Sequence, residues 1–397
     1  MEVAMKKIVL SAMGVLLMIL TTEAFCAPTV KMGAILPLTG PLAKEGQIVQ
    51  KIMSLAGEEI NAQGGIKSLG GAKVELVFGD NQSKADVAIS EVERLVEREK
   101  AIVLTEAWQS FITLAATRAA ERLKTPYYVP NSYADNITER GFRYTFQQTS
   151  KASVLAYEWV QFLNHVNKNF KKISKVGLLY ENTDMGQSSA DAAKVYLPEN
   201  GYKVVADISY PVRATDVTSF IVKLKAAEPD FVLQGGYMGN AILITQTADR
   251  LGLHVPFMDN GCMNDPSFNK AVGTLAEGKL GMTSWNKDVP GGKDLYEKVR
   301  SRYGIDLSGI YTCGYQAIWV IKEALEKAGS ADREALRDAL ATIHIPGSKL
   351  YIPLEKISFN EKGYNDKAGG WIITQVQNGE WFTVWPLKYA TKTRLFK

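Results

Sequence analysis

The segments of this sequence best suited to contact a small molecule come directly after apolar, strand-like runs. In the first half of the chain they read LTGPLAKEGQ, EAWQS and NSY, and in the second half ENTDMGQ, GGYMGN and DNGC. They are rich in Gly and in polar or aromatic residues. Ligands bind beyond the carboxyl ends of the strands in open α/β sheets, so these segments are predicted to line a binding site.

Three residues in these segments are suited to recognition of a ligand. Ser110 precedes an apolar helical run, so its hydroxyl could cap that helix or, with nearby amides, hold a carboxylate. Trp108 and Tyr237 could be core aromatics or could form a stacking surface for a ligand. Their positions at strand ends, next to Gly and polar residues, favour the stacking surface.

The sequence contains no recognisable set of catalytic residues. No CxxC, HExxH, GxSxG or GxGxxG motif occurs, and His165, His254 and His344 lie far apart without the spacing of metal ligands. GTLAEGK (273–279) matches the start of a phosphate loop, but Leu280 stands where Mg²⁺ binding needs Ser or Thr. The sequence therefore disfavours an enzyme, and no cofactor or metal is expected.

Strand-like runs alternate with helical periods through most of the chain. Helical spacing of apolar residues marks the segments between the runs, as in 86–99 and 113–123. This alternation predicts an α/β fold with two doubly wound lobes, each with a mainly parallel sheet and helices on both faces. The predicted strands are 30–36, 74–78, 101–105, 125–130, 175–180, 204–210, 231–237 and 256–260.

Near the C-terminus this pattern changes. Two runs rich in β-branched and aromatic residues, 371–377 and 380–385, flank Asn378 and Gly379. Asn-Gly is the strongest short-range signal for a β-hairpin. We therefore predict an antiparallel hairpin that adds to the edge of one of the sheets.

The first residues of the chain have the pattern of an export signal. Lys6 and Lys7 precede the apolar run IVLSAMGVLLMIL, which is short for a membrane span and is followed by small residues. We predict a secretory signal peptide over residues 1–26, with cleavage after Ala24 or Cys26.

Composition narrows the function further. The chain has 397 residues, a formal charge of +4 and 46% hydrophobic residues, and it contains no dense block of Lys and Arg. Nucleic acid is therefore not an expected partner. Cys262 and Cys313 remain once residues 1–26 are removed, and in an oxidising compartment they could pair or stay free.

Eight short motifs, each occurring once, are distributed along nearly the whole mature chain. They are GAILPLTGPLAKEGQ, EEINAQGGI, VELVFGDNQS, TLAATRAAERLKTPYY, NITERGFRYTFQ, LYENTDMGQSSADAAK, FIVKLKAAEPDFVLQGGY and YQAIWVIKEALEKAGSADREALRDAL. In this order and spacing, the chain resembles the type I periplasmic solute-binding proteins of ABC transporters, in the branch that binds branched-chain amino acids. Each motif is loose by itself, and the resemblance is specific through their order together with the signal peptide.

The resemblance implies two lobes that close on a ligand at a hinge of three crossover strands, near 146–149, 281–285 and 352–357. It also implies a periplasmic monomer that delivers its solute unaltered to the transmembrane subunits of an ABC permease. A sensing module that signals to a receptor would share this fold. The expected domains are a first lobe of 27–146 plus 284–354, a second lobe of 147–283 plus 355–390, and a tail of 391–397.

Binding residues of the family can be matched to this sequence one at a time. The family's carboxylate-binding Ser matches Ser110, and the Tyr of its GGY segment matches Tyr237. Its Thr in the next strand-end loop falls at Tyr133, beside Asn131, and its cleft Tyr of the second lobe falls at Met185. The resemblance therefore implies that these positions contact the ligand.

Two departures from the family bear on the ligand. An aromatic residue of the first loop falls at Glu45, and the Glu that pairs with the ligand's ammonium falls near Gly261, where no carboxylate stands. A buried ammonium without a counter-charge costs on the order of several kcal/mol. Either Glu45, Asp184 or Asp259 supplies the charge, or the ligand has no ammonium. The expected ligand is a small carboxylate-bearing solute, with an amino acid as the default and an aromatic acid or an amide such as urea as alternatives.

Overall fold

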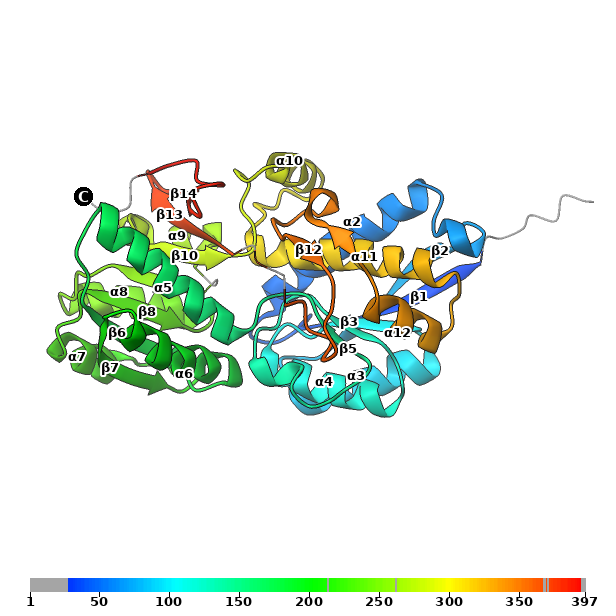
Figure 1. Cartoon of the computed structure of the whole chain (residues 1–397), viewed down its shortest axis with the longest axis horizontal. Helices are drawn as coiled ribbons and strands as arrows, with labels where there is room; N and C mark the ends of the chain where they lie inside the picture. The colour runs from blue at the N-terminus through cyan, green and yellow to red at the C-terminus, as the bar shows by residue number, and fades with distance from the viewer. Residues whose placement is uncertain (1–27, 213, 261–262, 367–368, 370, 394–397) are drawn as a thin grey trace, which may run out of the picture.

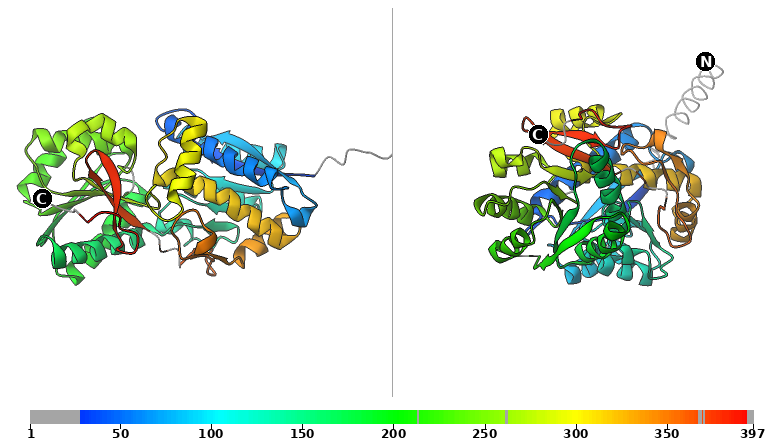
Figure 2. Two further views of the ribbon diagram at one scale, coloured as in Figure 1. Left: turned by 90° about the horizontal axis from the view of Figure 1, so that it is seen from above. Right: turned by 60° about the vertical axis from the view of Figure 1, so that its left-hand side comes forward.

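The chain folds into two α/β units that lie end to end along the long axis of the molecule (Figures 1 and 2). The computed structural model describes residues 28–212, 214–260, 263–366, 369 and 371–393, and the predicted signal peptide lies outside them. We call the unit with the five-stranded sheet the first lobe and the unit with the seven-stranded sheet the second lobe. The predicted α/β fold with two mainly parallel sheets is confirmed, whereas the bounds given above for the domains stay predictions.

The first lobe is built on a parallel sheet with the strand order β2-β1-β3-β4-β5. Its strands are β1 (Thr29–Leu36), β2 (Lys73–Asp80), β3 (Val103–Glu106), β4 (Tyr127–Val129) and β5 (Thr145–Gln147). Helices α2 (Ala43–Ala62) and α11 (Gly309–Ala328) cover one face, and α3 (Ala85–Glu93) and α4 (Ser110–Arg122) cover the other. Because successive side chains of a strand point to opposite faces, Met32 packs under α2 and α11, whereas Ile35 packs under α3 and α4.

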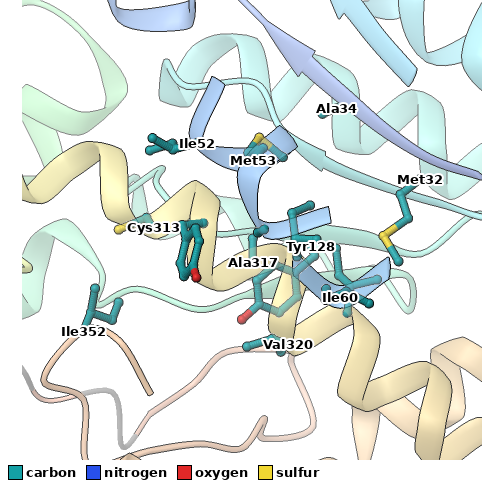
Figure 3. Close-up of a cluster of buried hydrophobic side chains, with 14 of the residues drawn as sticks. Met32, Ala34, Ile52, Met53, Ile60, Tyr128, Cys313, Ala317, Val320 and Ile352 are labelled. Carbon is teal, nitrogen blue, oxygen red and sulfur yellow. The ribbon is translucent and has the colours of Figure 1, made fainter. Parts of the chain in front are cut away.

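The core beneath α2 and α11 shows why these helices dock on the sheet (Figure 3). Ile52, Met53 and Ile60 of α2 recur at helical spacing and are buried beside Ala317 and Val320 of α11. Burying one large aliphatic side chain contributes roughly 1.5–3 kcal/mol. The apolar face of α2 therefore fixes the start of this helix close to the end of β1.

The second lobe has the strand order β14-β13-β10-β9-β8-β6-β7. Its parallel strands are β6 (Lys175–Glu181), β7 (Lys203–Tyr210), β8 (Phe231–Gly235), β9 (Phe257–Asp259) and β10 (Leu280–Thr283). Helices α5 (Ala152–Asn169) and α6 (Asp184–Glu199) pack on one face, and α7 (Thr218–Ala226) and α8 (Met238–Arg250) pack on the other. Each parallel strand therefore ends at the same edge of the sheet.

The predicted hairpin is confirmed at the edge of this sheet. Strands β13 (Ile372–Gln377) and β14 (Glu380–Trp385) pair antiparallel, and β13 also pairs antiparallel with β10. The turn residues Asn378 and Gly379 have φ angles of 56° and 77°. Two residues with positive φ are what a type I′ turn requires, so Asn-Gly identified the turn for a physical reason.

The chain crosses between the lobes after β5, after β10 and after β12 (Lys356–Ile357). Ile352 and Ile357 belong to the core of the first lobe, so the third crossing begins beyond them. The first and third crossings are bonded together. The backbone N–H of Gln147 donates to the carbonyl oxygen of Gly363 at 2.8 Å, and the N–H of Asn365 donates to the carbonyl oxygen of Gln147 at 3.0 Å. These bonded segments are the natural place for a hinge.

The phosphate-loop match is resolved by its surroundings. GTLAEGK follows the helix α9 (Pro266–Val272), whereas a phosphate loop follows a strand. The side chain of Asp265 accepts the N–H of Ser267 at 2.7 Å and caps this short helix. The match is therefore a chance one.

Of the two cysteines in the mature chain, Cys313 is a buried free thiol in α11, and Cys262 lies outside the described residues. Burial raises the pKa of the Cys313 thiol to about 12.

Among the residues that the structure describes, no helix has the length and apolar character needed to cross a membrane.

Candidate ligand-binding site

A cavity of about 40 Å³ lies between the lobes, at the strand ends that the sequence singled out. Residues of both lobes line it, and six of the eight candidate residues are among them. Asn260, from the DNGC segment, and Ile310, which lies outside every segment singled out from the sequence, complete the lining. The lining residues are Trp108, Ser110, Asn131, Tyr133, Met185, Tyr237, Asn260 and Ile310.

An unusual loop presents the first-lobe residues. Glu106, Ala107 and Trp108 have φ angles of 74°, 93° and 68°, in the left-handed region that non-Gly residues rarely adopt. The loop is held by the N–H of Ala107, which donates to the carbonyl oxygen of Ile35 at 2.9 Å. Such strain is kept where the surrounding structure enforces it, and it is common at binding sites.

Trp108 both packs in the core and lines the cavity. Its ring stacks on that of Tyr311 with centroids 5.8 Å apart and planes 22° apart, and 8% of the residue is exposed. The OH of Tyr311 donates to Asp265 Oδ2 of the second lobe at 2.8 Å. The two interpretations of Trp108 offered by the sequence are therefore compatible, because one face of the indole packs and the residue also borders the cavity.

Ser110 is placed to donate a hydrogen bond into the cavity. The prediction that it caps α4 is wrong, because Gln109 occupies the cap position and Ser110 is the first helical residue. Its Oγ accepts the backbone N–H groups of Tyr133 and Ala134, each at 3.2 Å. Because those bonds use its lone pairs, its own O–H remains available as a donor. A carboxylate is a suitable acceptor for such a hydroxyl.

Side chains on neighbouring loops fix the other walls. The OH of Tyr133 donates to Asn131 Oδ1 at 2.6 Å, which holds both residues at the end of β4. Asn260 Nδ2 lies 2.8 Å from the Met185 sulfur, and its Oδ1 accepts the N–H of Gly236 at 3.4 Å. Polar groups thus face an otherwise aromatic and apolar cavity, which is the usual composition of a small-molecule site.

A second, adjoining pocket of about 160 Å³ shares Tyr237 with this cavity. First-lobe residues form one wall and second-lobe residues the other, so it also lies between the lobes. Its lining residues are Pro41, Leu42, Ser83, Gln109, Glu181, Val212, Tyr237, Gly239 and Asn240.

Glu181 in this second pocket was missed by sequence reasoning. It is the last residue of β6 and its Oε1 accepts the N–H of Tyr237 and the Nδ2 of Asn240, both at 2.9 Å. Burial, helped by the nearby charge of Asp259, raises its pKa to about 7 against the opposing effect of these hydrogen bonds. The signal that could have found it was its place at the start of the ENTDMGQ segment.

Two nominated carboxylates line neither pocket. Glu45 lies in the first turn of α2, where burial raises its pKa. Asp259 is fully buried, and its Oδ1 accepts the N–H of Met263 at 2.9 Å. Their contact with a ligand therefore stays a prediction. Among the described residues, no group of three His, Cys, Asp or Glu side chains could hold a metal ion.

The class of protein follows from a family match that covers this whole arrangement. Residues 29–380 match the family model described as "Periplasmic binding protein". The match spans most of the chain, so the chain belongs to this family. The resemblance stated above is thereby confirmed, and so is the prediction that the protein is not an enzyme, because the family consists of solute-binding proteins.

Two proteins of known name are similar to this chain over most of its length. Leu/Ile/Val-binding protein homolog 7 of Brucella abortus (strain 2308) is 29% identical over 381 residues, 92% of this chain and 94% of that protein. A leucine-binding protein of Thermotoga maritima has a TM-score of 0.78 at 22% identity, covering 89% of this chain and 97% of the other.

One further structure carries an aromatic acid. It is a solute-binding protein of an ABC transporter from Rhodopseudomonas palustris BisB5, in complex with 3,4-dihydroxybenzoic acid. Its TM-score is 0.77 at 22% identity, covering 89% of this chain and 95% of the other. At this identity the likeness of the solved structures shows a common fold.

Proposed function

We propose that this chain is the substrate-binding component of an ABC transporter and holds a small carboxylate-bearing solute between its lobes. The observation that carries the proposal is the cavity in which the hydroxyl of Ser110 meets aromatic and polar side chains of both lobes. Its hydroxyl is anchored by two amides and keeps a donor for a carboxylate. The predicted signal peptide and the family match support a periplasmic location of the mature chain.

The mechanism is hinge closure. The first lobe would hold the carboxylate through Ser110, and the second lobe would close over the solute through Tyr237 and Met185. Closure removes water from the cavity, which strengthens the hydrogen bonds to the carboxylate. A membrane permease would then accept the closed form. No bond of the solute changes, so the site needs no nucleophile, metal or cofactor.

Two classes of carboxylate are candidates for the solute. The name of the Brucella relative favours a branched-chain amino acid, and the dihydroxybenzoate complex of the R. palustris protein favours an aromatic acid. Trp108 and Tyr133 would suit the flat ring of the second class. A sensing module would use the same cavity. Finding that the chain binds a receptor and not a permease would identify that alternative.

Calorimetry of ligand-stripped protein tests the proposal. Leucine, phenylalanine and benzoate are titrated into the native chain and into Ser110→Ala. We expect at least one carboxylate to bind and the variant to bind it more weakly. If none of them binds but a neutral amide such as urea does, the carboxylate is not the recognised group.

A further inference from the structure

The second pocket contains three buried polar atoms without a hydrogen-bond partner in the described residues. They are Ser83 Oγ, Gln109 Oε1 and Glu181 Oε2. The three residues are 4%, 6% and 0% exposed, and all of them line the pocket. A buried polar group without a partner is destabilising, and native proteins keep few of them. Three in one pocket mark a place where a ligand, or water in its absence, can supply the missing partners.

The backbone holds these three groups in place from both lobes. Gln109 is the cap residue of α4, and its carbonyl oxygen accepts the N–H groups of Ile112 and Thr113. The N–H of Ser83 donates to Asn81 Oδ1 at 2.9 Å. Glu181 is held through its other oxygen, Oε1, at the start of α8. The backbone that carries Ser83 and Gln109, and the carboxylate of Glu181, are therefore fixed in the two lobes, and all three side chains are buried.

The chemistry of the three groups defines what they can bind. When Glu181 is ionised its carboxylate only accepts hydrogen bonds, and a donor group bound beside it favours that form over the protonated one. The amide oxygen of Gln109 and the hydroxyl of Ser83 can accept as well. Pro41, Leu42 and Val212 provide apolar wall between them. A group with several N–H donors at the end of a short hydrocarbon chain would satisfy such a pocket.

We propose that the solute carries an N–H donor group, an ammonium or a primary amide, remote from its carboxylate, and that Glu181, Gln109 and Ser83 bind this group. This inference rests on the proposed function, because it requires the carboxylate to lie at Ser110. Tyr237 borders both pockets, so a solute that starts at Ser110 and passes Tyr237 enters the second pocket. A purely aliphatic or unsubstituted aromatic end would leave the three groups without partners.

The test compares solutes that differ only at the remote end. Isothermal titration of the ligand-stripped chain uses 5-aminopentanoate against hexanoate, which replaces the ammonium by a methyl group. 5-Amino-5-oxopentanoate against 5-methylhexanoate makes the same comparison for a primary amide, and the two pairs separate ammonium from amide. We expect at least one donor-bearing solute to bind ten times more tightly than its apolar counterpart.

Variants assign the effect to the pocket. Glu181→Gln keeps an acceptor for the N–H of Tyr237, and it should reduce the preference for the donor-bearing solute, measured as the ratio of the two dissociation constants, at least tenfold. Ser83→Ala and Gln109→Leu, which lie in the other lobe, should each reduce it several-fold, so the inference stays testable if one variant does not fold. Glu228→Gln, on the surface of the second lobe, serves as the control.

The outcomes separate this inference from the proposed function. If hexanoate, leucine or benzoate binds and the donor group adds no affinity, the inference is wrong and the proposed function stands. Tighter binding of glutarate than of 5-aminopentanoate would show that the pocket prefers an acceptor and would also overturn the inference. If no carboxylate binds at all, the proposed function itself fails.

Discussion

Replacing Ser110 by Ala removes one oxygen atom with two separate duties. Its O–H is the proposed donor to the carboxylate of the solute, and a hydrogen bond to a charged group contributes about 1.5–3 kcal/mol. The dissociation constant should therefore rise roughly ten- to a hundredfold. Its Oγ also accepts the N–H groups of Tyr133 and Ala134, each at 3.2 Å. Losing these two long bonds should lower the free energy of unfolding by about 2 kcal/mol.

Two assays separate these duties. Calorimetric titration measures the affinity, and urea denaturation of the ligand-free chain measures the stability. Thr117→Val is the matched control, because Thr117 is buried in the same helix and accepts a hydrogen bond from Arg140 at 2.6 Å, away from the cavity. It should lower stability and leave the affinity unchanged. Unchanged binding by Ser110→Ala would refute the role of this hydroxyl, whatever happened to stability.

The remaining predictions concern stability and reactivity. Burial raises the pKa of Glu106 to about 8, from 4.5, so the folded chain keeps this proton where the unfolded chain loses it, and stability should fall as pH rises from about 4.5 to 8. Glu106→Gln should therefore stabilise the chain by a few kcal/mol at pH 8 and little at pH 4, as urea denaturation would show. Gly363→Ala should cost roughly 2–4 kcal/mol, because its Cβ would lie 2.1 Å from a backbone carbonyl oxygen at the hinge. Gly141→Ala, with a similar positive φ but open space around it, should cost only about 1 kcal/mol; equal losses would contradict this steric argument. In a Cys262→Ser variant, Cys313 should not react with a thiol reagent until the chain unfolds, since it is fully buried with a raised pKa; rapid labelling of the native chain would contradict that burial.

The location of the site was predictable because it follows from topology. Parallel strands end at the same edge of a sheet, so residues placed just after several strands must come together. Trp108, Ser110 and Tyr133 were found in this way in the first lobe, and Tyr237 in the second. The hairpin was predictable for a more local reason, because few sequences other than Asn-Gly tolerate two positive φ angles.

The other residues of the site depended on tertiary contacts and side-chain direction, which a sequence pattern does not give. Ile310 lines the cavity because the second crossing returns α11 to the first lobe, far along the chain from the other lining residues. Glu181 is the last residue of a buried strand, so sequence analysis gave it less weight than the loop residues that follow it. Glu45 and Asp259 were of a suitable type, but sequence spacing does not fix which way a side chain points at the start of a helix or the end of a strand.

The position of a bound solute tests the central claim most directly. A crystal structure of the native chain with the tightest-binding carboxylate would show where that solute lies and whether it is intact. The account predicts an unaltered solute between the lobes, with a carboxylate oxygen within hydrogen-bond distance of Ser110 Oγ and Tyr237 closing over it. A solute bound outside the cleft, or one held in the cleft with its carboxylate far from Ser110, would contradict it.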